Sequence, residues 1–170
     1  MTTRLSDTAP GVRELMPALV RAWLVTGVLD GLFSSALSVF AYGSTVSRLF
    51  QGVAAVLIGP TAFDGGVPTV LLGVIMHFAV AFGWSAVFLL LVTRSAWIRG
   101  VLRSTRGVVS VAAVYGPFIW MVMSLAVIPL FTHRPPTIAF RWWVQFFGHF
   151  PFVGIPIVAS TGSGLQSRRG

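Results

Sequence analysis

Long apolar stretches separated by short polar turns form the dominant pattern of this chain. A helix needs about 20 apolar residues to cross a hydrocarbon core of about 30 Å. Four stretches meet that length, and they predict membrane spans at about 15–42, 67–93, 108–131 and 138–160. We therefore expect an all-α fold: an integral membrane bundle of four transmembrane helices plus one short helix.

The short helix is predicted at residues 46–58, a stretch that is apolar but too short to span a bilayer. Pro60 ends it, and the polar turn Phe63-Asp64-Gly65-Gly66 follows. Such a segment either lies in the membrane interface or dips into the membrane as a re-entrant helix, which needs protein or water around its ends. Arg48 and Gln51 on one side of the helix favour the interface.

Composition supports the membrane assignment. The chain is 55% hydrophobic and only 9% charged, whereas soluble domains carry about 25% charged residues. Cysteine is absent, which excludes disulfides and thiolate metal sites. The predicted membrane domain covers residues 15–161, with polar tails at 1–14 and 162–170.

The charge of the chain indicates a topology rather than a nucleic-acid partner. All 12 basic residues are arginines, and they lie at helix ends and in short loops, where lipid headgroups are the natural partners. Nine arginines lie on the side of the two termini and three on the other. The positive-inside rule then places both termini in the cytoplasm. Arg48 and the run Arg141-Trp142-Trp143 are predicted to meet the opposite interface.

Ionisable side chains interrupt the apolar spans at Asp30, His77 and His149. Each lies about 10 to 11 residues from the same end of its span, a depth of roughly 16 Å, which is near the membrane centre. Charge at that depth is costly, so such residues face protein or water rather than lipid. Gln145 lies one turn before His149. We predict that these four residues form an intramembrane polar cluster.

Small residues accompany the polar positions at helical spacing. Gly27 and Gly31 share a face with Asp30, and Gly73 lies one turn before His77. Glycines at such positions permit close helix packing, so we predict these three as helix-packing residues. The same pattern explains the polar cluster as hydrogen bonds between packed helices, each contributing around 0.6 kcal/mol. We interpret the cluster first in this structural way.

The fourth span contains Pro151 and Pro156, which lack a backbone N–H. They free the carbonyls of Phe147 and Phe152, so His149 is predicted to lie where backbone acceptors are exposed. Broken helices of this kind line cavities in transporters, and they also arise as packing adjustments. The sequence leaves both interpretations open.

The polar cluster also permits chemical roles. His77 and His149 could ligate the iron of a haem or the magnesium of a chlorophyll-type pigment. With Asp30 they could form a proton or cation relay or a site of two histidines and a carboxylate, although no cofactor is required and we assign no metal ligand. The sequence has no nucleotide-binding loop, Gly-x-Ser-x-Gly or His-Glu-x-x-His, so we expect no enzymatic activity.

One stretch of sequence resembles a known group of proteins. It comprises Arg48-Leu49-Phe50-Gln51-Gly52-Val53-Ala54, Gly59-Pro60-Thr61-Ala62-Phe63-Asp64-Gly65-Gly66 and His77-Phe78. It is similar to a widespread set of small bacterial membrane proteins that are predicted to have four helices and have no known function. The resemblance extends over about residues 25 to 158 and is weakest in the third span. It implies a bacterial inner-membrane location and a four-span topology, and no activity or cofactor.

These features favour a non-catalytic membrane protein, an accessory or structural subunit within a larger assembly of, for example, photosynthetic or respiratory type. Its expected partners are membrane lipids and other integral membrane proteins or further copies of itself, and not nucleic acid. Two alternatives stay open. One is a small oligomeric proton or ion transporter or channel that uses Asp30, His77 and His149, and the other is a haem- or pigment-binding membrane protein.

Overall fold

The computed structural model describes residues 12–166, and over that range it contains helices and no strands. Within the described residues, four helical segments are long and apolar enough to cross a membrane: Leu15–Ala41, Gly66–Arg94, Thr105–Thr132 and Phe140–Gly162. A shorter apolar helix, α2, covers Val46–Ile58. The all-α fold class is therefore confirmed, and the ends of the four segments lie within about three residues of the predicted spans.

Three of the four spans contain a π-helical turn, whereas the second span is a regular α-helix. The first span is α1 (Val12–Ala36) followed by η1 (Leu37–Ala41), and the second is α3 (Gly66–Arg94). The third consists of α5 (Thr105–Val122), η3 (Met123–Val127) and α6 (Ile128–Thr132). The fourth consists of α7 (Phe140–His149), η4 (Phe150–Gly154) and α8 (Ile155–Gln166).

The first and last helices extend into the predicted polar tails. Helix α1 starts at Val12 and α8 continues to Gln166, so parts of both tails are helical. The remainder, residues 1–11 and 167–170, lies outside the described residues.

The irregular fourth span has a backbone different from the one that its prolines predict. Pro151 opens the π turn η4, and π turns are frequent at functional sites. The carbonyl of Phe147, expected to be free, instead accepts the N–H of Phe150. The prediction of an exposed acceptor at Phe147 was therefore wrong, because its carbonyl accepts an N–H from the residue three positions later instead of four.

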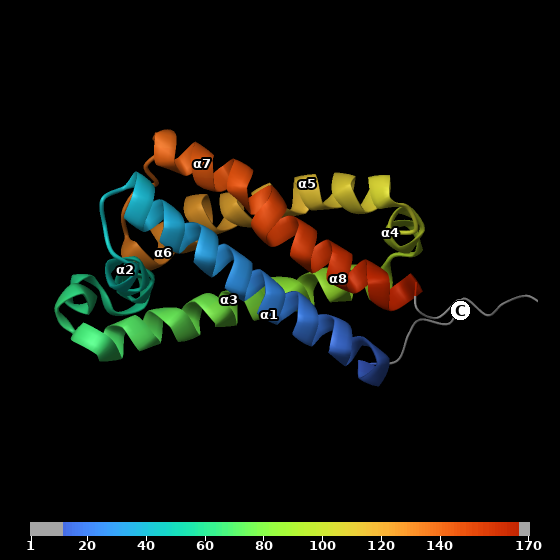
Figure 1. The fold of residues 1–170 in the computed structure, drawn as a ribbon, viewed down its shortest axis with the longest axis horizontal. Coiled ribbons are helices and arrows are strands. Elements are labelled where there is room, and N and C mark those ends of the chain that lie inside the picture. Colours follow the sequence, from blue (N-terminus) through green and yellow to red (C-terminus); the bar gives the residue numbers. More distant parts are fainter. Residues whose placement is uncertain (1–11, 167–170) are drawn as a thin grey trace, which may run out of the picture.

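The spans run along the long axis of the molecule, and the short elements gather at its two ends (Figure 1). The start of α1 and the end of α8 lie at the end that carries α4 (Ala96–Val101), called here the α4 end. Helix α2 and α6 lie at the opposite end, called here the α2 end. Helix α2 is drawn nearly end-on in Figure 1, so its axis runs across the spans rather than alongside them.

The arginine-rich connection between the second and third spans is more ordered than the predicted loop. It folds as α4 because Ser95 caps its start, accepting the N–H of Ile98 at 3.3 Å. Arg99 then donates to the carbonyls of Val92 and Thr93 at 2.9 and 3.0 Å. These bonds satisfy carbonyls in the last turn of α3 that the helix itself cannot satisfy.

The tightest apolar packing lies in the half of the bundle near α4. Phe88 and Val92 of α3 pack there with Leu102, and α5 and α8 add residues such as Ala112 and Ile157. Each of these side chains is buried. Toward the α2 end the spans separate, and α2 fills part of the space between them.

Candidate functional site

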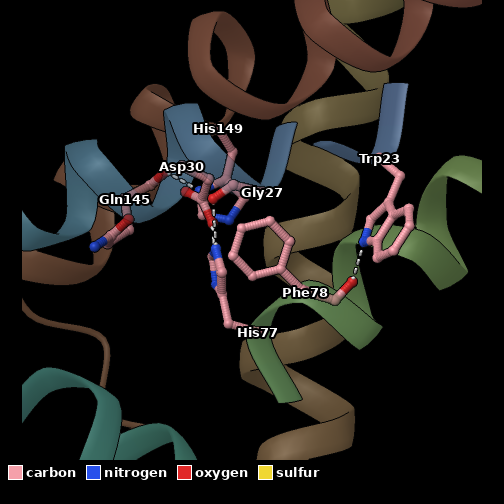
Figure 2. Close-up of polar contacts among 7 residues, drawn as sticks. All are labelled: Trp23, Gly27, Asp30, His77, Phe78, Gln145 and His149. Atoms are coloured by element: carbon pink, nitrogen blue, oxygen red, sulfur yellow. Dashed lines mark hydrogen bonds and ion pairs between the residues drawn. The ribbon is translucent and has the colours of Figure 1, made fainter. Parts of the chain in front are cut away.

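Asp30 and His77 form an ion pair between the first and second spans. Oδ2 of Asp30 lies 3.9 Å from Nδ1 of His77, and their side chains are only 18% and 14% exposed. Nε2 of His77 lies 2.9 Å from the carbonyl oxygen of Gly27, one turn before Asp30 on α1. Figure 2 shows the imidazole extending from α3 toward both groups. The structure thus brings together the two residues that the sequence placed at one depth.

The hydrogen bond to Gly27 fixes which ring nitrogen of His77 carries a hydrogen and which one faces Asp30. A carbonyl oxygen only accepts, so Nε2 of His77 must carry the hydrogen. Nδ1 then faces Asp30 either as a lone pair, suited to a protonated carboxyl, or as N–H⁺, suited to a carboxylate. When Asp30 and His77 together hold one proton, the two groups carry no net charge.

The two predicted packing glycines of α1 make room for this arrangement. A methyl group on Gly27 would collide with the ring of Phe78, and one on Gly31 would lie 3.4 Å from Nε2 of His77. Trp23 donates from Nε1 to the carbonyl of Phe78 at 2.8 Å, which also ties α1 to α3 (Figure 2). The small-residue face of α1 is thus the surface on which His77 is held.

His149 is fixed by its own helix. Its Nδ1 donates to the carbonyl of Gln145, one turn earlier, at 2.7 Å, so Nε2 of a neutral ring is left as an acceptor. The His149 side chain is 7% exposed, and its ring lies 4.9 Å from that of Trp120 on α5. At Gly116, α5 approaches the carbonyl of His149 so closely that no Cβ would fit. His149 is therefore set by the contact between the third and fourth spans.

The polar cluster lines one cavity inside the bundle, called here the central cavity. Its volume is about 490 Å³, and Asp30, His77, Gln145 and His149 all contribute to its wall. Figure 2 shows Asp30, His77 and His149 approaching one another from α1, α3 and α7. Apart from the polar cluster, most of the lining is apolar or aromatic, including Trp84. A mostly apolar cavity with a few convergent polar groups is the usual form of a small-molecule site.

Several polar atoms in this wall have no partner in the protein. Over the described residues, six buried side-chain N or O atoms lack a hydrogen bond, and four of them belong to residues of the central cavity. They are Oγ1 of Thr26, Oδ1 of Asp30, Nε1 of Trp120 and Oε1 of Gln145. Buried polar groups are nearly always satisfied, so their concentration here indicates a place that binds water or a polar ligand.

A second cavity, of about 680 Å³, continues from the central cavity toward the α2 end. The two share wall residues, among them Gly52, Trp120 and Gln145. In the other direction, Ile119, Val153 and Ile157 belong both to the central cavity and to the tightly packed core. The second cavity therefore adjoins the polar cluster on the side of the α2 end, and buried core residues adjoin it on the side of the α4 end.

Helix α2 contributes to the walls of both cavities. At Gly73 the backbone of α3 meets the carbonyl of Phe50 so closely that only glycine fits, as predicted for this packing residue. The ring of Phe50 also lies 5.9 Å from that of His77. Gln51 is buried, whereas Arg48 is exposed and lies 4.8 Å over the ring of Phe63. Helix α2 therefore packs on α3 one turn from His77, and both the interfacial and the re-entrant placement of residues 46–58 stay predictions.

The other predicted interface residues lie at the α2 end, away from the polar cluster. Arg141 stacks on the ring of Tyr42 at 4.2 Å, and Trp143 is 47% exposed. Trp142 differs from the prediction, since it turns inward and donates from Nε1 to Oγ of Ser124 at 2.9 Å. Trp142 therefore connects α7 to η3, and it also lines the second cavity.

The geometry does not suit a cofactor held by two histidines. Both ring nitrogens of His77 are engaged with α1, so ligation would require its bond to Gly27 or its pairing with Asp30 to break. His149 retains only Nε2 for such a role. Among the described residues, no group of three His, Asp or Glu side chains is placed to hold a metal ion.

Trp120 is the site residue that the sequence did not reveal. It stands among bulky apolar residues of the third span, where no charge marks it as polar. The signal was its spacing, because Gly116 and Trp120 lie one turn apart and both meet His149. Thr26 of α1 also lines the central cavity, and no signal in the sequence indicated that place.

Comparison with known proteins adds no family to this picture: no protein-family model, no curated protein and no solved structure matches the chain. The resemblance of residues 25 to 158 to small bacterial membrane proteins therefore stays a prediction. The site has to be interpreted from its own geometry.

Proposed function

We propose that this chain is a small, non-catalytic membrane transporter of protons or cations in which Asp30 and His77 form the proton-exchanging pair. The observation that carries the proposal is the concentration of unpartnered polar atoms around that pair, inside a cavity between the spans. Intramembrane ionisable residues of this kind mark proton relays and ion pathways. A purely structural cluster would satisfy its own hydrogen bonds, as the bonds of Trp23 and Trp142 do.

The access to the site favours a carrier over an open channel. The central cavity continues toward the α2 end, while residues such as Val92 and Ile157 close the α4 end with fully buried side chains. A proton that enters from the α2 end reaches Asp30 and meets an apolar barrier beyond it. Passage to the other side then requires a change of packing, as in transporters with alternating access.

Proton flux through reconstituted vesicles tests the proposal. Wild-type protein should dissipate an imposed pH gradient, and Asp30→Asn should abolish this flux because an amide cannot exchange the proton. Asp64→Asn is the matched control, since Asp64 is exposed in the turn after α2 and lies outside the central cavity. Equal flux through wild type and Asp30→Asn would overturn the proposal.

The accessory-subunit interpretation remains a separate prediction. The outer faces of the spans carry exposed apolar side chains, among them Phe40 at 88% and Phe140 at 80%. Lipid covers such faces as readily as a partner protein does, so they do not favour a larger assembly. Purification in mild detergent checks this prediction through the co-purification of a larger complex.

A further inference from the structure

We infer that the ligand of the central cavity is an organic ammonium ion with an apolar body, which enters from the α2 end and displaces the proton of the Asp30–His77 pair. This inference rests on the proposed function and names its substrate class. It depends on the chemistry of the unpartnered atoms, the aromatic walls and the charge of the pair.

The unpartnered atoms of the cavity call for a hydrogen-bond donor. Oδ1 of Asp30 and Oε1 of Gln145 can only accept, and Oγ1 of Thr26 can also accept. His149 adds Nε2 as an acceptor, because its Nδ1–H is already given to the carbonyl of Gln145. A primary ammonium group offers three N–H donors and no acceptor, which matches these acceptors. The fourth unpartnered atom, Nε1 of Trp120, is itself a donor and is not satisfied by an ammonium group.

The walls of the cavity suit an apolar cation. Trp84 and Trp120 line it, together with Phe63, Met76 and Met123. Aromatic faces attract cations, and the attraction increases when the site excludes water. A volume of about 490 Å³ also lies within the range of sites for small organic molecules. An inorganic cation would leave most of this apolar surface without contact.

Among the described residues, Asp30 is the only acidic side chain that lines either cavity, whereas Arg134 and Arg141 line the second cavity on the entry side. The titratable and charged residues in the wall of the central cavity are Asp30 of α1, His77 of α3, His149 of α7 and Arg48 of α2. Arg48 is exposed and stacks on Phe63, at the side of the cavity formed by α2. Among the described residues, α5 adds no charged side chain to this wall.

Ammonium binding and proton binding are therefore competitive. When the Asp30–His77 pair holds one proton it is neutral, so an arriving ammonium ion would leave the buried site with a net positive charge. Release of the proton toward the α2 end restores neutrality: the N–H groups of the ligand bond to the Asp30 carboxylate, and His77 remains neutral with Nε2–H on Gly27. The ion exchanges with one proton and no covalent bond of the ligand changes.

Binding of a matched pair of probes to the purified full chain tests this inference. The probes are 2-phenylethylammonium and 2-phenylethanol, which share an aromatic body and differ in the charged group. Affinity is read from tryptophan fluorescence in detergent, and proton release from a pH-indicator dye in weak buffer. We expect the ammonium to bind at least about tenfold more tightly than the alcohol, since a charge-assisted hydrogen bond contributes that much or more. Only the ammonium should release a proton.

Asp30→Asn should lower the ammonium affinity to that of the alcohol while alcohol binding persists, which shows that the cavity is intact. Asp64→Asn should behave as wild type. Equal binding of the two probes to wild-type protein would overturn the inference, and this comparison stands even if Asp30→Asn fails to fold. If the ammonium does not bind but Asp30-dependent proton flux persists, the substrate class is wrong and the proposed function stands. If flux is independent of Asp30, the proposed function itself fails.

Discussion

At the scale of single residues, backbone contacts decide what the polar side chains can do. The carbonyl of Gly27 holds one nitrogen of His77, and the carbonyl of Gln145 holds one nitrogen of His149. Each histidine thereby loses one of its two tautomers when neutral. Nδ1 of His77 is then the nitrogen that faces Asp30, 3.9 Å from Oδ2.

The glycines of α1 provide a graded test of this arrangement. Gly27→Ala should destabilise the protein by about 1–3 kcal/mol, the usual cost of overpacking, because the new methyl group meets the ring of Phe78. Gly31→Ala should have a smaller effect, since the nearest atom, Nε2 of His77, lies 3.4 Å away. Unfolding in detergent measures both variants. A larger loss for Gly31→Ala would contradict this account of how α1 and α3 pack.

Much of the site at this scale could be predicted from the sequence. A charge in an apolar span is visible in the sequence, so Asp30, His77 and His149 were found by depth, and Gly27, Gly31 and Gly73 by spacing. The unpartnered atoms were not visible, because a hydrogen bond depends on which neighbour a side chain meets. The hydrogen bond from Trp142 to Ser124 and the place of Trp120 beside His149 arise from contacts between spans distant in sequence.

At the scale of elements, helix α2 completes the wall around the candidate site. It crosses α3 at Gly73, covers the side of the bundle next to His77 and lines both cavities. Its limits match the prediction because Thr45 caps its start, accepting the N–H of Arg48 at 3.1 Å, and Gly59 ends it at φ +76°. The sequence could not show where the helix packs, since that depends on the shape of α3.

Gly73→Ala should displace α2 from α3, because a Cβ there collides with the carbonyl of Phe50, which is backbone and cannot turn away. We expect a loss of stability of about 1–3 kcal/mol and weaker binding in the central cavity. Gly83→Ala on the same helix is the control, since nothing lies within 4 Å of its Cβ position. The control should be neutral or slightly stabilising, as alanine favours helix by up to about 1 kcal/mol. Equal effects of the two variants would show that the close contact between α2 and α3 at Gly73 is not needed for stability or for binding in the central cavity.

At the scale of the whole molecule, the bundle is loosely packed at one end and tightly packed at the other. The cavities lie toward the α2 end, and the apolar core lies toward the α4 end. The order of spans and their lengths could be read from hydropathy. The asymmetry of packing could not, because both ends are equally apolar in sequence and differ only in how closely the helices approach.

Cysteine labelling can display this asymmetry, since the chain has no cysteine of its own. Ser34→Cys places a thiol in the wall of the central cavity, whereas Ser85→Cys places one at a site that is 1% exposed and outside that wall. A small water-soluble thiol reagent should label the first variant rapidly and only from the side of the α2 end. The second should resist labelling from both sides. Labelling of Ser34→Cys from the α4 side would show that the apolar core does not close the cavity.

The π turn η4 has a consequence for how the cavity wall is aligned. His149, Val153 and Ile157 all line the central cavity at intervals of four residues. In a regular α-helix each such step turns the side chain by about 40° around the axis, so the three would drift apart by about 80°. The wider turn at Phe150–Gly154 takes more residues per revolution and compensates for this drift. Removing one residue from η4 would restore an α-helix in which Ile157 follows His149 by seven positions, about 20° short of two full turns, so these two side chains would stay aligned.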